Sequence, residues 1–321
     1  MLYEKIYFMK KFFAIPAFLF LALNIYAQIK PIEIKTEVNT SDNNISFTAI
    51  NNSFNTYSVS MNITSSEGYR NPFSTNNFIT VSRGPSSIGK LERIPNQSSY
   101  TYQYSYSYFI GQSLRNIPDT NFVYLLPASN GQLLKGSNNV QSIEKTLGQK
   151  VSSIYYGYFF SFELGDTVCA ARSGVVYSVA DETKEEEKTN QIYSASRNKL
   201  DIEQKDGTLA HYFFTAPIKM LVEAGDKVIA GQPLAIFSTP SDKLQMLFSI
   251  NYLSEKPLRD YIFSNRDEEK MKRIYQYLPV KFYLDKDYTN FISETGKYKV
   301  LHPVNIITQE MTKKELKKFN Q

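Results

Sequence analysis

The stretch Gly165-Asp166-Thr167-Val168-Cys169-Ala170-Ala171-Arg172-Ser173-Gly174-Val175-Val176 decides the fold of this chain. It runs into Val175-Val176-Tyr177-Ser178-Val179, whose β-branched and aromatic residues favour a strand. Cys169 lies where the side chain of a strand residue would pack. The segment therefore predicts short β-strands joined by tight connections.

Three further segments extend this unit to about residues 151–253. They are Asp206-Gly207-Thr208-Leu209-Ala210-His211-Tyr212, Val222 to Leu234, and Leu244-Gln245-Met246-Leu247-Phe248-Ser249-Ile250. Asp206-Gly207 is a hairpin turn signal. Gly225 and Gly231 suit tight turns between short strands. We expect a compact core made of β-strands.

In order and spacing, these four segments resemble the core of lysostaphin/LytM-type zinc endopeptidases. Enzymes of that family cut peptide cross-bridges in bacterial cell walls. The resemblance implies the family's β fold, the duplicated hybrid motif, over residues 151–253. An N-terminal β domain, this core and a C-terminal tail together are similar to exported proteins of the Bacteroidota.

The family's zinc ligands are missing from the matching positions. The family binds zinc through a histidine and an aspartate of an H-x-G-x-D element and through the last histidine of H-x-H. Tyr155, Phe159 and Leu247 stand at these positions, and Gln245 stands at the first histidine of H-x-H. A catalytic zinc needs three protein ligands, so the resemblance implies a site without metal or cofactor. His211 matches a family residue that polarises water, and we interpret it as a relic. Tyr155, Phe159, His211, Gln245 and Leu247 would line what we call the relic groove.

Two other kinds of site, a rebuilt metal site and a cysteine nucleophile, could use residues that lie near His211. Glu163, Asp166, Cys169 and His211 are the candidates for a rebuilt metal site, and Cys169 with His211 is a candidate nucleophile and base. Nothing in the sequence orients that pair, and a lone cysteine is usually buried and inert. We therefore expect neither chemistry.

Residues 28–115 alternate between apolar and polar side chains with period two. Tyr57, Val59, Met61 and Ile63 are one run, and the odd positions between Tyr100 and Tyr108 are polar. The chain has 24 Tyr, 22 Phe and no Trp, which favours strands. This pattern predicts a small antiparallel β-sandwich. The tyrosine ladder either packs half-buried or forms a carbohydrate-binding platform.

An export signal opens the chain. Met9-Lys10-Lys11 is a positive region, Phe12 to Leu23 is apolar, and Ile25-Tyr26-Ala27 precedes a cleavage point at Gln28. We expect residues 1–27 to be a signal peptide rather than an uncleaved anchor, and the protein to be periplasmic or extracellular. No later segment is apolar enough to cross a membrane. The net charge of +5 is dispersed, which argues against nucleic-acid binding.

The remaining residues, 254–321, read as a short α/β extension. A helix is expected from Ser264 to about Tyr277, and a strand over Val280-Lys281-Phe282-Tyr283. Thr312 and Glu315 form a capping-box pattern before a basic helix. The predicted fold class is mainly β, with a signal peptide (1–27), a β-sandwich (28–115), a peptidase-like core (116–253) and this extension.

Three hypotheses of function follow. The first is an exported, catalytically inactive peptidase-fold protein of the cell envelope, which binds cell-wall peptide or glycan or regulates a cell-wall hydrolase. Its partner would be peptidoglycan or an envelope protein. The second is an active zinc endopeptidase with atypical ligands. The third is a structural module that acts through its N-terminal sandwich.

Overall fold

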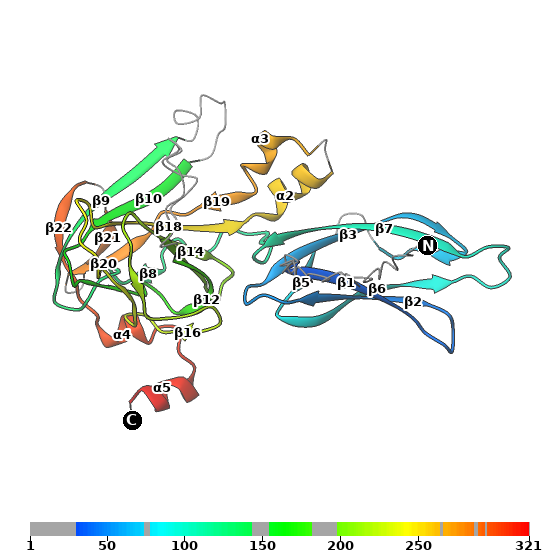
Figure 1. The fold of residues 1–321 in the computed structure, drawn as a ribbon, viewed down its shortest axis with the longest axis horizontal. Helices are drawn as coiled ribbons and strands as arrows, with labels where there is room; N and C mark the ends of the chain where they lie inside the picture. Colours follow the sequence, from blue (N-terminus) through cyan, green and yellow to red (C-terminus); the bar gives the residue numbers. More distant parts are fainter. Residues whose placement is uncertain are drawn as a thin grey trace, which may run out of the picture. The chain divides into compact units, whose positions relative to one another are not determined.

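The computed structural model describes residues 30–73, 78–142, 154–181, 198–263, 266–285, 288–292 and 294–320. The expected signal peptide lies outside the described residues. Pro31–Gln321 form one compact unit. Strands dominate this unit, and its few short helices lie toward the C-terminus, which confirms the predicted mainly β class (Figure 1).

Two antiparallel sheets enclose the first hydrophobic core. Their strand orders are β1-β2-β6-β4 and β5-β3-β7. The strands are β1 Ile32–Val38, β2 Ile45–Asn51, β3 Tyr57–Glu67, β4 Tyr69–Arg70, β5 Ile79–Val81, β6 Gly84–Arg93 and β7 Thr101–Ile110. Phe47, Val59 and Leu91 are fully buried between them. This arrangement is the antiparallel sandwich that the alternation predicted.

The tyrosine ladder lies on β7 and packs against this core. Tyr102, Tyr104, Tyr106 and Tyr108 are partly buried there. The ring of Phe47 meets those of Tyr102 and Tyr104 edge to face, with centroids 5.9 and 5.4 Å apart. Edge-to-face contacts stabilise aromatic clusters, so the structure favours the packing interpretation over an exposed carbohydrate platform.

The second core lies under a nine-stranded sheet with the order β16-β12-β13-β14-β18-β10-β9-β22, in which β19 also pairs with β18. Two three-stranded sheets, β11-β17-β15 and β21-β20-β8, add residues to the same core. The strands are β8 Val123–Tyr124, β9 Leu133–Ser142, β10 Ile154–Ser161, β11 Thr167–Cys169, β12 Gly174–Asp181, β13 Asn198–Glu203, β14 Leu209–Phe214, β15 Lys219–Met220, β16 Lys227–Val228, β17 Pro233–Ile236, β18 Gln245–Leu253, β19 Tyr275–Tyr277, β20 Lys281–Asp285, β21 Tyr288–Phe291 and β22 Gly296–Lys299.

Alternation decides which face of the large sheet meets this core. Tyr158, Tyr212 and Phe248 point into it and are almost fully buried. Their neighbours in sequence therefore point to the opposite face, which carries the residues of the candidate site.

The C-terminal residues differ in part from the predicted pattern. The helices there are α2 Glu255–Ile262, α3 Glu268–Met271, α4 Val304–Ile307 and α5 Lys313–Phe319. The expected helix up to Tyr277 is wrong at its end, because Tyr275–Tyr277 form β19 and pair with Asn251 to Leu253 of β18. Pairing with the free end of β18 outweighs the helical pattern. The capping box of Thr312 and Glu315 is confirmed at the start of α5.

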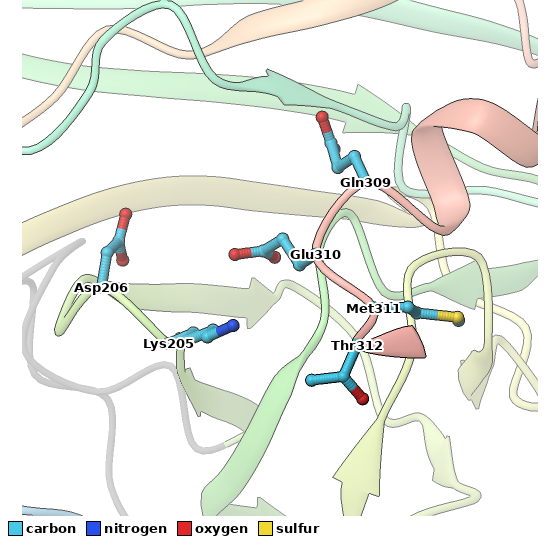
Figure 2. A pocket seen from close by; sticks show the side chains of 6 residues that line it. All are labelled: Lys205, Asp206, Gln309, Glu310, Met311 and Thr312. Carbon is cyan, nitrogen blue, oxygen red and sulfur yellow. The ribbon is translucent and has the colours of Figure 1, made fainter. Parts of the chain in front are cut away.

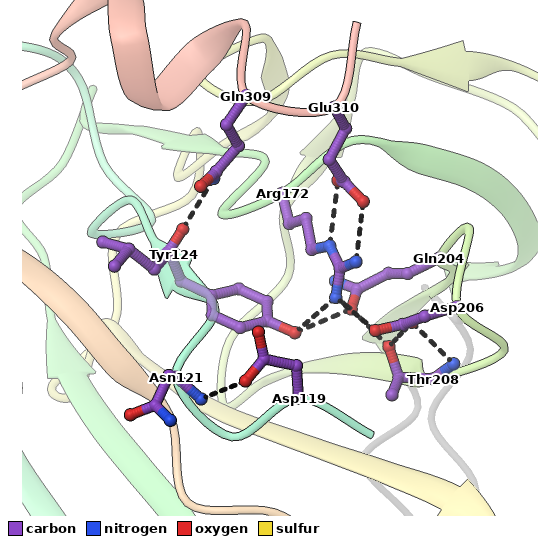
Figure 3. Close-up of polar contacts among 10 residues, drawn as sticks. Asp119, Asn121, Tyr124, Arg172, Gln204, Asp206, Thr208, Gln309 and Glu310 are labelled. Atoms are coloured by element: carbon purple, nitrogen blue, oxygen red, sulfur yellow. Dashed lines mark hydrogen bonds and ion pairs between the residues drawn. The ribbon is translucent and has the colours of Figure 1, made fainter.

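A buried arginine ties the C-terminal segment to the core (Figure 3). Arg172 is 4% exposed. Its Nε and Nη2 donate to the two carboxylate oxygens of Glu310 at 2.9 and 2.7 Å. Its Nη1 donates to the Tyr124 hydroxyl at 2.9 Å and to Asp206 at 2.8 Å. Burial raises the pKa of Asp206, but the charge of Arg172 outweighs it and holds that pKa below the usual value.

Replacing Arg172 should therefore destabilise the protein strongly. Arg172→Ala leaves the Glu310 and Asp206 carboxylates without their cation, and such a loss costs about 3–5 kcal/mol. Arg115→Ala is the control, because Arg115 pairs with Glu255 but is 79% exposed, and exposed pairs contribute less than about 1 kcal/mol. Urea unfolding followed by circular dichroism measures both. Equal losses in the two variants would contradict the anchoring role of Arg172.

Candidate functional site

Two parallel rows of residues cross the face of the large sheet that lies opposite the core. The strand register sets them, running from β13 through β14 and β18 to β10. The first row is Lys199, Phe213, Leu247 and Phe159, and the second is Asp201, His211, Ser249 and Gly157. Neighbouring strands lie about 4.8 Å apart, so residues within a row are direct neighbours.

The first row is apolar at its centre. Phe159 stands directly opposite Leu247, and Phe213 is the partner of Leu247 on the other side. Phe159 and Phe213 are half-buried, and Leu247 is 8% exposed. The alignment of the motifs predicted that Phe159 and Leu247 would meet, and the register places them so.

Gln245 and Tyr155 flank these rows. Gln245 lies at the start of β18, where its Nε2 donates to the Ser161 hydroxyl at 3.3 Å. The Tyr155 ring folds back over Gly157, because a Cβ built on Gly157 would lie 2.5 Å from Cε1 of Tyr155. The same ring contacts that of Tyr277, with centroids 4.7 Å apart. Glycine at 157 is thus what allows an aromatic ring to cover this part of the sheet.

His211 is held by a partner that the motifs did not reveal. Its Nδ1 lies 2.8 Å from Oδ1 of Asp201, which is 2% exposed. The other oxygen of Asp201 pairs with Lys199 Nζ at 3.0 Å. Burial raises the pKa of Asp201, but the hydrogen bond with His211 and the charge of Lys199 outweigh it and keep that pKa below its usual value. Asp201 is therefore an ionised acceptor that orients the imidazole ring.

The hairpin signal contained enough information to find Asp201. Antiparallel pairing around the Asp206-Gly207 turn joins residues that are equally distant from Asp206. Asp201 and His211 are such a pair, five residues to either side. The turn and both strands are recognisable in the sequence, and the pairing across them gives Asp201 as the partner of His211.

A cavity of 470 Å³ opens beside His211. Its walls come from the sheet face and from the segment between β2 and β3, and its lining is Ser53, Asn55, Tyr57, Ile110, Tyr177, Ser178, Lys199, Asp201, Leu209, His211, Phe213, Asn251 and Tyr275. The backbone N–H of Thr56 donates to the Glu203 carboxylate at 2.7 Å, which fixes this segment. Burial raises the pKa of that carboxyl group.

The side chains at the family's zinc positions do not fit zinc. Phe159 and Leu247 end in hydrocarbon, so two of the three ligands that a catalytic zinc needs have no donor atom. Within the described ranges, no group of three or more His, Cys, Asp or Glu side chains is placed to hold a metal ion. Zinc bound as in the family would require different side chains at these positions.

The residues considered for a rebuilt site have other roles. Asp166 accepts hydrogen bonds from the backbone N–H of Glu163 at 2.8 Å and from Gln132 Nε2 at 2.6 Å. Cys169 is buried, which raises the pKa of its thiol to about 11. A thiol with so high a pKa carries almost no thiolate near neutral pH, as expected of an inert cysteine.

A second cavity, of 580 Å³, lies at the segment that precedes α5 (Figure 2). It is lined by Lys205, Asp206, Gln309, Glu310, Met311 and Thr312. Both of its carboxylates, Asp206 and Glu310, are already bound to Arg172. We therefore place the candidate functional site at His211. Over the part of the chain that the structure describes, no helix has the length and apolar character needed to cross a membrane.

Comparisons with known proteins do not assign the chain to a family. No protein-family model matches the chain, and no curated protein matches it. Among solved structures, the chain is similar to the structure of Helicobacter pylori Csd3 from the orthorhombic crystal, at 11% identity and a TM-score of 0.27. The match covers 69% of this chain and 66% of that chain, just under two thirds of its length. A likeness this low carries no argument about activity.

Restoring the missing ligands should create a zinc site. The triple variant Tyr155→His, Phe159→Asp, Leu247→His places three donors on one face of β10 and β18, and we expect about one zinc per chain. The double variant that keeps Leu247 is the control and should bind much less. Elemental analysis after dialysis against trace zinc measures the content. One zinc in the wild type, or none in a folded triple variant, would contradict the assignment of these positions.

Proposed function

We propose that this protein is an exported, catalytically inactive peptidase-fold protein of the cell envelope that binds cell-wall peptide or glycan in the relic groove. The observation that carries the proposal is the apolar row in which Phe159, Leu247 and Phe213 are direct neighbours. At the positions of Phe159 and Leu247, the family that the sequence resembles has donor atoms. Export rests on the signal-like segment at residues 1–27.

The chemistry of the remaining polar groups supports inactivity. Asp201 and His211 form an oriented base, and general-base help contributes typically about 10²–10⁴-fold. Hydrolysis of an amide also needs stabilisation of the developing oxyanion, which is usually the largest single contribution. The neighbours of His211 in its row are Ser249 and Asp201, and neither carries the positive charge that a metal ion would supply to that oxyanion.

The surface of the site supports binding. The half-buried rings of Tyr155, Phe159 and Phe213 lie on one sheet face, and the His211 ring stacks near Phe213 with centroids 5.9 Å apart. Aromatic rings provide large contact areas for the apolar faces of sugars and peptides. A protein that holds cell-wall peptide in this way would also be suited to regulate a hydrolase acting on it.

The alternative, an active zinc endopeptidase, is favoured by one observation. The Asp201–His211 pair, with its 2.8 Å contact, retains the geometry of an oriented general base. That function would need metal ligands other than Tyr155, Phe159 and Leu247. We therefore rank it second.

Binding to purified cell walls tests the proposal. The wild type should sediment with insoluble peptidoglycan, and the double variant Phe159→Ala, Phe213→Ala should bind about tenfold more weakly, because each ring contributes about 0.5–1.5 kcal/mol. Phe291→Ala is the matched control, since Phe291 is 40% exposed and lies on β21 away from both rows. No sedimentation of the wild type, or equal sedimentation of the double variant, would contradict the proposal.

A further inference from the structure

The cavity beside His211 has polar groups that lack partners. The ring nitrogen Nδ1 of His211 faces an ionised carboxylate, which can only accept a hydrogen bond, so Nδ1 carries the proton. In the neutral ring, Nε2 is then an acceptor. Among the described residues, this buried Nε2 has no hydrogen-bond partner.

A second acceptor lies on the neighbouring strand. Asn251 is 6% exposed, and its Oδ1 is also buried without a partner among the residues that the structure describes. Burial raises the pKa of Tyr277, and a hydrogen bond with the Asn251 side chain partly offsets that rise. Asn251 pairs with Leu209, two residues from His211 on β14. Two unsatisfied acceptors thus lie diagonally adjacent in one wall, and each buried acceptor left unpaired costs about 1–3 kcal/mol.

The cavity also has a donor and little net charge. Burial, with Asp201 nearby, raises the pKa of Tyr177 well above its usual value, so its hydroxyl stays protonated and can donate. The one lysine and the one aspartate of the lining, Lys199 and Asp201, neutralise each other at 3.0 Å. A charged ligand would leave an unpaired charge in a partly buried site, which is unfavourable. An uncharged ligand with N–H donors and a carbonyl acceptor fits best.

We propose that this cavity binds a carboxamide group, whose N–H donates to His211 Nε2 and whose carbonyl accepts from Tyr177, while a second N–H or an O–H of the same ligand donates to Asn251 Oδ1. The rings of Tyr57, Phe213 and Tyr275 form the apolar part of the lining. A peptide bond and the acetamido group of an amino sugar share this chemistry. The inference rests on the proposed function in that it names the group recognised at the same site, and it adds the segment between β2 and β3 as part of the site.

The chain's two histidines allow a direct test by NMR. Only His211 lines the cavity, whereas the backbone N–H of His302 donates to Asn130 in another part of the fold. The Cε1–H signal of each histidine is followed while N-acetylglucosamine, glucose or N-acetylglycine N-methylamide is added, and His302→Gln assigns the two signals. We expect the His211 signal to shift with a carboxamide probe, not with glucose, and the His302 signal to stay.

Two variants make the test specific. Asn251→Leu removes one acceptor, and Tyr177→Phe removes only the hydroxyl; each should weaken binding about tenfold. If Asn251→Leu does not fold, Tyr177→Phe still decides the outcome. A shift with the sugar alone identifies an acetamido ligand, and a shift with the amide alone identifies a peptide. Equal shifts with glucose, or no His211 shift with any probe, would overturn the proposal.

The same data separate this inference from the proposed function. If His211 responds to carboxamides but the protein does not sediment with cell walls, the cavity assignment stands and the envelope function fails. If the protein sediments but Asn251→Leu and Tyr177→Phe bind cell walls and probes like the wild type, the carboxamide site is wrong. The proposed binding of cell walls in the relic groove then still stands.

Discussion

The antiparallel register of β13, β14, β18 and β10 is the constraint on which the rest of the site depends. Tyr158, Tyr212 and Phe248 lock this register because they are almost fully buried on one face. A shift by one residue would turn these rings toward the opposite face. The same register places Asp201 beside His211 and Phe159 opposite Leu247. Packing on the core side of the sheet therefore determines which residues are neighbours on the opposite side.

The site combines an oriented general base, His211, with an adjacent row of apolar side chains. Asp201 holds His211 through a 2.8 Å contact, yet the neighbouring row offers hydrocarbon where a metal centre would need donors. Zinc would otherwise act as the Lewis acid for peptide hydrolysis. What remains is a surface of aromatic rings beside a cavity of 470 Å³. The proposed binding of a ligand rests on this surface.

Much of the fold followed from local patterns. Alternation identified the sandwich, Asp206-Gly207 marked the β13–β14 hairpin, and Thr312 with Glu315 marked the start of α5. The prediction of a helix up to Tyr277 was wrong because residues 275–277 form a strand that pairs with β18. Local periodicity in the sequence does not show that this part of β18 is free to pair. The role of Arg172 was also missed, since its partner Glu310 is 138 positions away in the chain.

The candidate site was only partly predictable, for a similar reason. The motifs indicated Tyr155, Phe159, Gln245 and Leu247. Phe159 meets Leu247 because β10 and β18 are neighbouring strands. Finding Asp201 requires the pairing register of the β13–β14 hairpin, which follows from the Asp206-Gly207 turn. Asn251 and Tyr177 carry no motif, and the residues Ser53, Asn55 and Tyr57 come from a distant part of the chain. Long-range packing, which no local pattern contains, brings these groups to one cavity.

The measurement that bears most directly on this account is peptide-bond cleavage in purified cell walls incubated with the wild-type protein and added zinc. New amino groups are counted over time, with Asp201→Asn as the comparison, because that change weakens the orientation of His211. The account predicts no release above the buffer rate by either protein. Steady release by the wild type that falls in the Asp201→Asn variant would show a working hydrolase and contradict the account.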